Sequence, residues 1–468
     1  MNEIRDLRNR SRAWFLRNLL LPAGDLYFQQ GLMKRLKFLE KAQWWDQKRL
    51  HAHRDRLLSD LMGIAWREVA FYRELMEKSN LTSENIRKPE DLQRFPIVVK
   101  DMIRAAYPGR ITRKTGQKTY EQHSSGSTGA NFFVLEDPET TGWYRATVFL
   151  CLEWAGWRIG EKHVQTGMTV QRSLDRQLKD ALLGCHYVPA ADLSDRNLDK
   201  TLEALDHYSI QHLWGFPATL YYLALRARDR RWNRPMRSLV TWGDQLYPHY
   251  RQTIEEVFRA RVYDTYGCSE GMQIAAQCGH GAGYHVHTLD VILEFVDDYG
   301  NPASRHSAAN LIVTRLHAGP MPLIRYRIGD MAVRGTEDLC ACGRGFELIQ
   351  SIQGRATDVV ITPSGNRLIV HFFTGILEHF HEIHSFQVVQ KNLSSALIRV
   401  VTPDGRPLAA EAHRRIKTEL QSRGMGDMEI DVEQVAEIPI SPAGKRRFII
   451  SELVATQSRQ ARTSGSPS

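Results

Sequence analysis

The run HSSGSTGAN, from His123 to Asn131, has the composition of a phosphate-binding loop. Small residues allow backbone N–H groups to approach phosphate oxygens, and serine and threonine hydroxyls add further donors. The run does not match the Walker pattern, because no Lys-Ser or Lys-Thr pair follows at the required spacing. Taken alone, it predicts either a phosphate loop or an exposed turn.

Four later segments carry polar residues where strands or turns are expected to end. They are YDTYGCSEG (263–271), PLIRYRIGD (322–330), IQGRATD (352–358) and IPISPAGKRRF (438–448). Each segment is weak evidence alone, since Asp330 could be a turn acid and Lys445 a solvated charge. Their common order along the chain is far more specific than any one of them.

This order and spacing resemble the adenylate-forming superfamily, which includes acyl-CoA synthetases, adenylation domains and luciferases. The resemblance covers about residues 60–450. The segments NLLLPAGDL, VAFYRELME and DLQRFPIVVKDMIR are most similar to the phenylacetate–CoA ligase branch and its capsular-polysaccharide-biosynthesis (CapK-like) relatives. This resemblance implies a large N-terminal α/β domain with a helical beginning and a small, mobile C-terminal α+β domain.

The resemblance implies an ATP site. The residues that would hold the β- and γ-phosphates are Ser124, Ser125, Gly126, Ser127, Thr128 and Gly129. Those that would line the adenine pocket are Tyr266, Gly267, Gly243 and Asp244, with the Tyr266 ring stacked on the base. A carboxylate can accept two hydrogen bonds, which suits Asp330 to the ribose hydroxyls.

The same resemblance implies the catalytic groups. Glu270, with Thr128, would hold Mg²⁺, and Lys445 would reach the acyl carboxylate and the α-phosphate. Arg355 would contact the ribose or phosphate near the hinge. Negative charge spreads over the phosphoryl oxygens when a carboxylate attacks the α-phosphate, so cations and backbone donors stabilise that state. ATP, AMP, Mg²⁺ and CoA are the expected ligands.

Two positions depart from the family pattern. Thr357, followed by Asp358, stands where the family commonly has an acid two places after the hinge arginine. The departure bears on the pivot of the small domain and not on adenylation. Ser441 in SPAGK stands where the family often has threonine.

Three readings of the function follow. The first is an AMP-forming ligase that adenylates an acid, possibly an aryl acid, and transfers the acyl group to CoA. The second passes the acyl or aminoacyl group to a carrier protein, an amine or a sugar hydroxyl, in polysaccharide or secondary-metabolite biosynthesis. The third is a non-catalytic scaffold, and the presence of Asp330, Arg355 and Lys445 argues against it.

A second group of residues has metal-ligand chemistry. Cys278 and His285, with six residues between them, and the close pair Cys340 and Cys342 make a Cys₃His set suited to structural Zn²⁺. His287 is the alternative imidazole, and unpaired thiols near a loop are the alternative reading. Some phenylacetate–CoA ligase relatives carry a similar set, which favours zinc.

Aromatic residues predict an acyl pocket. Trp214, Phe216 and Trp242 lie in LWGFPATLYYLAL and VTWGD, and would suit a planar or medium-sized apolar acid. Core packing is the alternative for these side chains. His123 would either face this pocket or be a buried, hydrogen-bonded histidine.

Composition sets the wider frame. The chain has 468 residues, a net charge of +9 and 42% hydrophobic residues, which indicates a soluble protein of two or three domains. The mild basic excess suits an anionic ligand, nucleic acid, a membrane surface or only solvent, and no nucleic-acid-binding motif spacing is present.

No apolar run approaches the length of about 20 residues that a membrane-spanning helix needs. Six cysteines are too few for a disulfide scaffold, and a cytoplasmic location follows as the default. RAWFLRNLLLPAGDLYF is expected to be an amphipathic helix that lies on a surface or packs on the body. The oligomeric state is open, with a dimer as one option.

Four regions are expected to position these groups. Apolar residues at spacings of three and four predict a helical region over 1–105, with a helix restarting after Val99. Helical segments alternate with short β-rich runs and predict an α/β core over 106–355, whose ligands would sit at the carboxyl ends of strands. The runs expected to be strands are NFFVLED, QHLWGFP, SLVTWGD, RVYDTYG, DVILEFV and NLIVTRL. A compact α+β lid domain is expected over 356–455, and a disordered tail over 456–468.

Overall fold

The structure is a computed structural model of the chain. It describes residues 11–124, 132–167, 172–190, 192–243, Leu246, 248–281, 283–297, 299–305, 307–336, 338–352, 359–377, 379–383, 385–402, 405–438 and 449–451. Within these ranges, no helix is both long enough and apolar enough to cross a bilayer. The expected tail at 456–468 lies outside the described residues.

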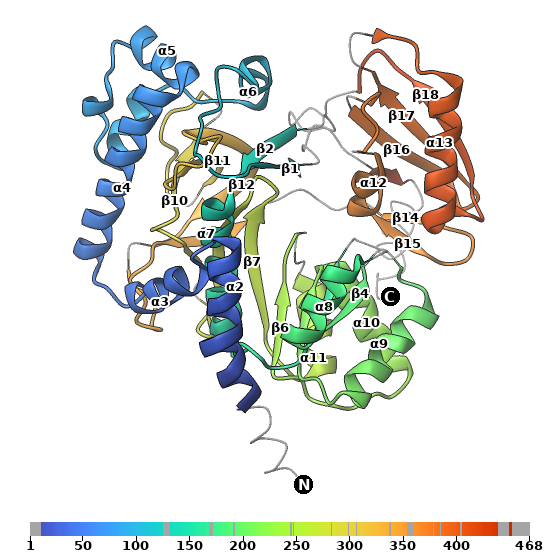
Figure 1. The fold of residues 1–468 in the computed structure, drawn as a ribbon. Coiled ribbons are helices and arrows are strands. Elements are labelled where there is room, and N and C mark those ends of the chain that lie inside the picture. The colour runs from blue at the N-terminus through green and yellow to red at the C-terminus, as the bar shows by residue number, and fades with distance from the viewer. Residues whose placement is uncertain are drawn as a thin grey trace, which may run out of the picture.

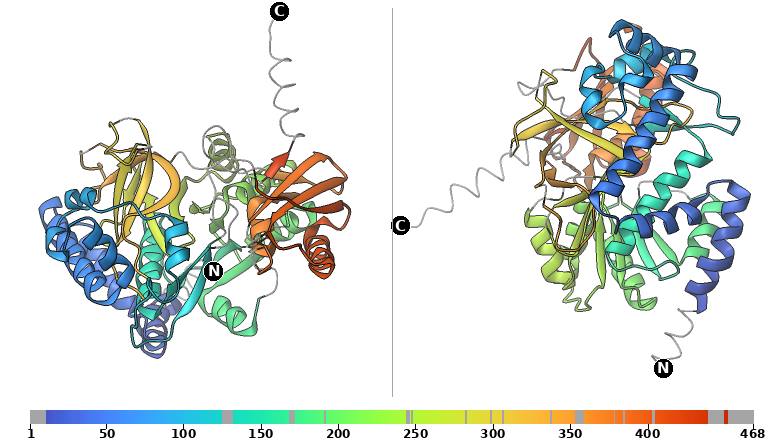
Figure 2. Two further views of the ribbon diagram at one scale, coloured as in Figure 1. Left: turned by 90° about the horizontal axis from the view of Figure 1, so that it is seen from above. Right: turned by 90° about the vertical axis from the view of Figure 1, so that its left-hand side faces the viewer.

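The first hundred residues are helical, as the apolar spacing predicts. The helices are η1 (Leu16–Leu20), α2 (Leu21–Phe28), α3 (Leu32–Ala42), α4 (Gln47–Glu68), α5 (Ala70–Lys78), η2 (Ser83–Asn85), η3 (Pro89–Arg94) and α6 (Lys100–Ala106). Helix α4 begins where the Asp46 side chain accepts a hydrogen bond from the Arg49 N–H at 2.7 Å. Helix α6 confirms the predicted restart after Val99. These helices, blue in Figure 2, run along one side of the large domain.

An eleven-stranded sheet forms the large domain. Its order is β10-β11-β12-β13-β9-β8-β7-β6-β5-β3-β4. The strands are β3 (His163–Gly167), β4 (Cys185–Pro189), β5 (His212–Gly215), β6 (Ser238–Thr241), β7 (Val262–Cys268), β8 (Met272–Gln277), β9 (Tyr284–Val286), β10 (Val291–Val296), β11 (Ala308–Arg315), β12 (Tyr326–Arg334) and β13 (Leu348–Ile352). Strands β4, β3, β5, β6 and β7 are parallel, and the pairs from β7 to β10 are antiparallel. Strand β7 therefore joins the two halves.

Further elements flank this sheet. They are the hairpin β1 (Tyr120–Ser124) and β2 (Phe132–Glu136), and the helices α7 (Pro138–Trp154), α8 (Leu174–Leu183), α9 (Asp195–His207), α10 (Pro217–Asp229) and α11 (Pro248–Phe258). The sequence predicts the α/β class and strands β2, β5, β6, β7, β10 and β11. It missed β1, β3, β4, β8, β9, β12 and β13 because they are short or mix polar with apolar residues.

The small domain has its own core. Its elements are β14 (Val359–Ile361), β15 (Arg367–Ile369), α12 (Val370–Leu377), β16 (Ser385–Asn392), β17 (Ser395–Val401), α13 (Ala410–Leu420), η5 (Gln421–Met425), β18 (Glu429–Gln434) and β19 (Ile449–Ser451). Strands β18, β17, β16 and β19 form one sheet, and one apolar cluster from Val360 to Ile449 fills the space under it. The domain stands to one side of the large domain (Figure 1). The expected boundary at 355–356 falls in residues 353–358, outside the described part.

Candidate functional site

Two of the predicted nucleotide residues meet near the centre of the sheet. The Tyr266 hydroxyl, on β7, donates a hydrogen bond to Asp330 Oδ2, on β12, at 3.0 Å. The register of β7 against β8 shifts between Tyr266 and Gly267. A Cβ at Gly267 would lie 2.7 Å from the Met272 carbonyl oxygen, so this close backbone contact requires glycine. The fold therefore brings an aromatic ring and a carboxylate from distant segments to one place.

Glu270 lies in the tight turn between β7 and β8 and is almost fully buried. Its Oε1 accepts a hydrogen bond from the Tyr326 hydroxyl at 2.8 Å and lies 3.2 Å from Lys100 Nζ. Burial is the largest single effect on the Glu270 pKa and raises it. The nearby Lys100 charge and the Tyr326 hydrogen bond outweigh burial and hold this pKa below its usual range. Glu270 is thus a buried, ionised carboxylate.

Lys100 and Tyr326 are the residues that sequence reasoning missed at this site. Lys100 is the first residue of α6, and Tyr326 is the first residue of β12. The hydrogen bonds between Val98 and β12 hold the two segments together: Val98 N donates to Arg325 O, and Arg327 N donates to Val98 O, each at 2.9 Å. The available signal was that both residues lie in segments that carry the family resemblance, Lys100 in DLQRFPIVVKDMIR and Tyr326 in PLIRYRIGD.

A buried ion pair forms the wall behind the Glu270 turn. Arg315 Nη1 lies 2.5 Å from Glu136 Oε1, and Arg315 Nη2 donates to the Thr140 carbonyl oxygen at 3.1 Å. Gly271 has φ +79°, and a Cβ there would lie 2.4 Å from Glu136 Oε1. Glycine at 271 therefore lets the turn reach the ion pair closely, and the pair fixes the turn from behind.

Of the three aromatic residues predicted for the acyl pocket, Trp242 contacts both of the others, Phe216 and Trp214. Phe216 follows β5 and packs with Ala190, which follows β4, and against Trp242, which follows β6. These three positions share the carboxyl edge of the parallel strands, where ligands of α/β sheets bind. A Cβ at Gly243, which has φ +83°, would lie 2.5 Å from the Phe216 ring, so the Gly243 backbone closes this corner.

Trp214 also packs in the core of the large domain. Its ring is stacked on His163, with centroids 3.8 Å apart, and it meets Trp157 edge-on at 5.0 Å. The side chain is 4% exposed. Core packing is the alternative that the sequence left open for Trp214, and the structure has that packing.

Several predicted site residues lie outside the described residues. They are Ser125, Gly126, Ser127, Thr128, Gly129, Asp244, Arg355 and Lys445. Of His123 and Ser124 only the backbone is described, and both are in strand β1, paired with Phe133 and Phe132. The roles expected for all of these residues remain predictions.

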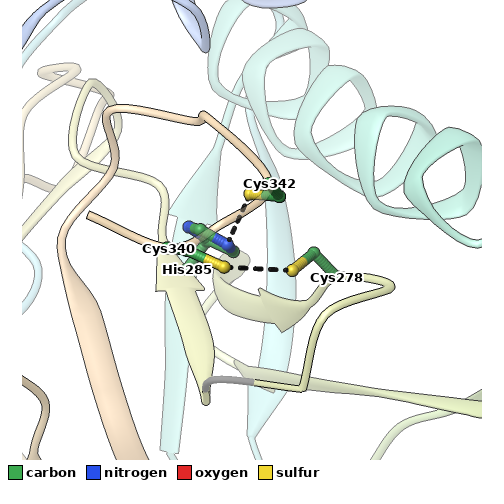
Figure 3. A group of neighbouring side chains, drawn as sticks. All are labelled: Cys278, His285, Cys340 and Cys342. Atoms are coloured by element: carbon green, nitrogen blue, oxygen red, sulfur yellow. Dashed lines mark hydrogen bonds between the residues drawn. The ribbon is translucent and has the colours of Figure 1, made fainter. Parts of the chain in front are cut away.

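The predicted Cys₃His set is gathered in space. Cys278 follows β8, His285 is in β9, and Cys340 and Cys342 lie between β12 and β13 (Figure 3). The four ligand atoms all lie within 4.8 Å of one another. Cys278 Sγ is 3.6 Å from Cys340 Sγ, and Cys342 Sγ is 3.3 Å from His285 Nε2. A tetrahedral zinc site has ligand–ligand edges of roughly 3.5–3.8 Å, so this donor set fits Zn²⁺.

The alternative imidazole, His287, is engaged elsewhere. Its Nε2 is 3.1 Å from Cys151 Sγ, and its ring is stacked on Trp154 with centroids 5.5 Å apart. His285 lies in β9 and His287 directly follows that strand, and the two histidines meet different partners. His285 is therefore the imidazole of the set.

Asp290 is a buried acid whose pKa is influenced by the Arg315–Glu136 ion pair. Its titration predicts how the stability of the protein changes with pH. Neither of its carboxylate oxygens has a hydrogen-bond partner among the described residues, and His317 Nε2 is 3.7 Å from Oδ1. Burial raises the Asp290 pKa to about 6, while Arg315 lowers it and Glu136 raises it further. The folded protein thus holds this proton more tightly than the unfolded chain does.

We expect Asp290 to destabilise the protein as pH rises. A raised pKa in the folded state means that its stabilising effect is present at low pH and is lost as pH rises through about 4 to 6. Asp290→Asn removes this titration, so the variant should gain about 1 kcal/mol relative to wild type between pH 5 and 7.5. Urea unfolding at both pH values measures this difference. A variant-minus-wild-type difference independent of pH would contradict the raised pKa.

Comparisons with known proteins find similarity to phenylacetate-coenzyme A ligases and to protein CapK. A family model described as the CapK C-terminal domain matches residues 360–452. A phenylacetate-coenzyme A ligase of Thermus thermophilus is 24% identical over 334 residues, which are 68% of this chain and 73% of that protein. Protein CapK of Staphylococcus aureus is 23% identical over 391 residues, which are 82% of this chain and 85% of that protein.

Solved structures show the same fold. The crystal structure of 2-hydroxyisobutyryl-CoA ligase in the postadenylation state, in complex with 2-HIB-AMP, aligns with a TM-score of 0.58 and 19% identity. The alignment covers 91% of this chain and 94% of that one. The same ligase with 2-HIB-AMP and CoA in the thioesterification state aligns with a TM-score of 0.59. The expected resemblance is thereby confirmed: this chain is similar to phenylacetate-coenzyme A ligases and to protein CapK, it has the fold of 2-hydroxyisobutyryl-CoA ligase, and its small domain matches the CapK C-terminal domain.

Proposed function

We propose that this protein is an ATP-dependent, AMP-forming carboxylic acid ligase that adenylates an acid and transfers the acyl group to CoA. The observation that carries the proposal is the meeting of Tyr266, Asp330 and the buried Glu270 turn at β7, the strand where the parallel and antiparallel halves of the sheet join. This constellation suits an adenosine and its phosphates. The curated relatives named phenylacetate-coenzyme A ligase support the same reaction class.

The proposed chemistry follows from the charges at the site. Asp330 would accept the ribose hydroxyls, with the Tyr266 hydroxyl orienting its carboxylate. Lys445 would neutralise charge that develops at the α-phosphate as the acid attacks and pyrophosphate leaves. Phe216 and Trp242 would receive the apolar part of the acid at the carboxyl edge of the strands. Loss of pyrophosphate, gripped by residues 124–129, would complete the first half-reaction.

Two metal ions are part of the proposal. A hard cation such as Mg²⁺ prefers oxygen ligands, and Glu270 offers an ionised carboxylate. In the structure its Oε1 already contacts Lys100 and Tyr326, so we expect Lys100 to move toward a phosphate when the nucleotide and Mg²⁺ are bound. We also propose that Cys278, His285, Cys340 and Cys342 hold a structural Zn²⁺, which their distances allow.

The similarity to CapK supports a second candidate function, in which the acyl acceptor is not CoA. The small domain matches the CapK C-terminal domain, and a protein named CapK is similar over 82% of this chain. An adenylated acid passed to a carrier protein, an amine or a sugar hydroxyl is therefore the second candidate. A cytoplasmic location is proposed with both, since both use ATP.

Acid-dependent ATP–pyrophosphate exchange with purified protein tests the proposal. We expect exchange with at least one member of a panel of aryl, fatty and amino acids, and its loss in Lys445→Ala. The adenylating acid is then incubated with CoA, with a carrier protein and with candidate amines and sugars. Thioester formation with CoA supports the first candidate, and transfer to another acceptor alone supports the second. Exchange with no acid would overturn adenylation itself.

A further inference from the structure

The first described helix presents an apolar face to solvent. From residue 11 to residue 28 the helix continues through η1 and α2. The large apolar side chains exposed along it are Trp14, Phe15, Leu19, Leu26, Tyr27 and Phe28. Leu26 and Tyr27 are more than 80% exposed. So many exposed aromatic and leucine side chains on one helix are uncommon on a monomer surface and mark a binding surface.

The charged residues of this helix point inward instead. Arg17 pairs with Glu40 and Glu153, and the Asp25 carboxylate accepts hydrogen bonds from the backbone at the start of α3. Arg12 Nη2 donates to the carbonyl oxygens of Ala181 and Leu182, at 3.2 and 3.0 Å. None of the exposed residues between 11 and 28 is charged. The side of the helix that faces solvent therefore carries no charged residue, and the charged side chains contact the rest of the large domain instead.

Helix α8 adds a second apolar face beside the first. Leu174, Leu178 and Leu182 are spaced by four residues, so they lie on one side of α8, and all three are exposed. The two hydrogen bonds of Arg12 join the beginning of the first helix to the end of α8. Both helices lie on the front of the molecule in Figure 1 and on one side of it in the view from above in Figure 2.

Cations accompany these two faces. Arg176 and Lys179 are exposed on α8, and Arg172 stands just before it, paired with Asp180. In the sequence, Arg5, Arg8 and Arg10 precede the first helix, with Glu3 and Asp6 among them. The whole chain carries a net charge of +9. Exposed tryptophan, tyrosine, phenylalanine and leucine beside arginine and lysine are the composition of helices that lie in a lipid interface.

We propose that the exposed faces of helix 11–28 and α8 dock onto the surface of an anionic lipid bilayer. The apolar side chains would enter the boundary between headgroups and acyl chains, and Arg176 and Lys179 would meet the acidic headgroups. A second copy of the chain suits the face less well, because a two-fold contact would set the same cations against each other. The proposal is independent of the ligase activity.

Vesicle sedimentation with the full-length protein tests this docking. Wild-type protein should sediment with phosphatidylglycerol–phosphatidylcholine vesicles, and more than about tenfold less with pure phosphatidylcholine. Phe15→Ser/Leu19→Ser should weaken binding by about tenfold or more. The matched control is Tyr299→Ser/Leu393→Ser, which removes an exposed aromatic residue and an exposed leucine elsewhere and should bind as wild type does. Arg176→Glu/Lys179→Glu should weaken binding and flatten its dependence on salt.

Two further readouts keep the test decisive. Brominated lipid should quench the fluorescence of the wild type more than that of Trp14→Phe. Sedimentation velocity reports the oligomeric state without lipid. Equal vesicle binding by wild type and Phe15→Ser/Leu19→Ser would overturn the proposal. The proposal would also be overturned if the wild type bound no vesicles but formed a dimer that Phe15→Ser/Leu19→Ser abolished. The exposed faces would then form the contact with a second copy of the chain.

Discussion

Replacing Glu270 with glutamine is expected to reduce acid-dependent ATP–pyrophosphate exchange by about 10²- to 10³-fold. Glutamine keeps the shape and can still accept the Tyr326 hydrogen bond, but it removes the ionised carboxylate. That charge is what a bound Mg²⁺ requires from the site. The Mg²⁺ concentration that gives half-maximal exchange should therefore rise as well, which a purely structural defect would not cause.

Stability must be separated from this effect. Glu270→Gln removes a counter-charge from Lys100, and breaking a buried pair costs up to about 3–5 kcal/mol. Glu294→Gln is the matched control, because the Glu294 side chain is largely buried, at 11% exposed, and pairs with Arg325 at 2.9 Å outside the proposed site. It should lose comparable stability and keep the exchange activity and its Mg²⁺ dependence. If both variants lost exchange in proportion to their melting temperatures, Glu270 would be a structural residue only.

The sequence predicted the α/β class of the fold but located only some of the strands in the large domain. Helical spacing located the N-terminal helices, and the alternation of patterns located six strands of the large domain. Strand β3 (HVQTG) and strand β8 (MQIAAQ) lack a long β-branched run, so their own residues do not favour a strand. They are strands because neighbouring strands pair with them on both sides. That pairing is tertiary, and local patterns do not contain it.

The candidate site was predictable where one segment carries several functional residues. YDTYGCSEG contains both Tyr266 and Glu270, so a resemblance to a known motif found them together. Lys100 and Tyr326 were missed although DLQRFPIVVKDMIR and PLIRYRIGD contain them, because neither segment shows on its own that the two side chains converge on Glu270. The contact of Lys100 with Glu270 spans 170 positions, and only the folded chain brings them within 3.2 Å. For Trp214 the sequence left a pocket and core packing open, because aromatic residues fill cores as readily as pockets, and its ring is buried in the core.

Removal of one thiol from the Cys₃His set is expected to abolish zinc binding and to destabilise the large domain. Cys340→Ser should carry less than about one tenth of an equivalent of zinc, where the wild type carries about one. The set joins the segment after β8 and strand β9 to the β12–β13 connection, so its loss frees that connection. The melting temperature should therefore fall by several degrees, as it should when a chelator removes zinc from the wild type.

Cys185→Ser is the matched control for this experiment. Cys185 is a free cysteine in β4, outside the four-residue set, and its replacement should leave the zinc content at the wild-type value. Metal analysis is done on protein purified under reducing conditions, because Cys278 Sγ and Cys340 Sγ lie only 3.6 Å apart and could otherwise be oxidised together. Wild-type protein without stoichiometric zinc would refute the metal site. Zinc that stays bound in Cys340→Ser would instead place the ion on other residues. A closed four-ligand site has no position for substrate, so zinc removal should lower stability before it lowers exchange at low temperature.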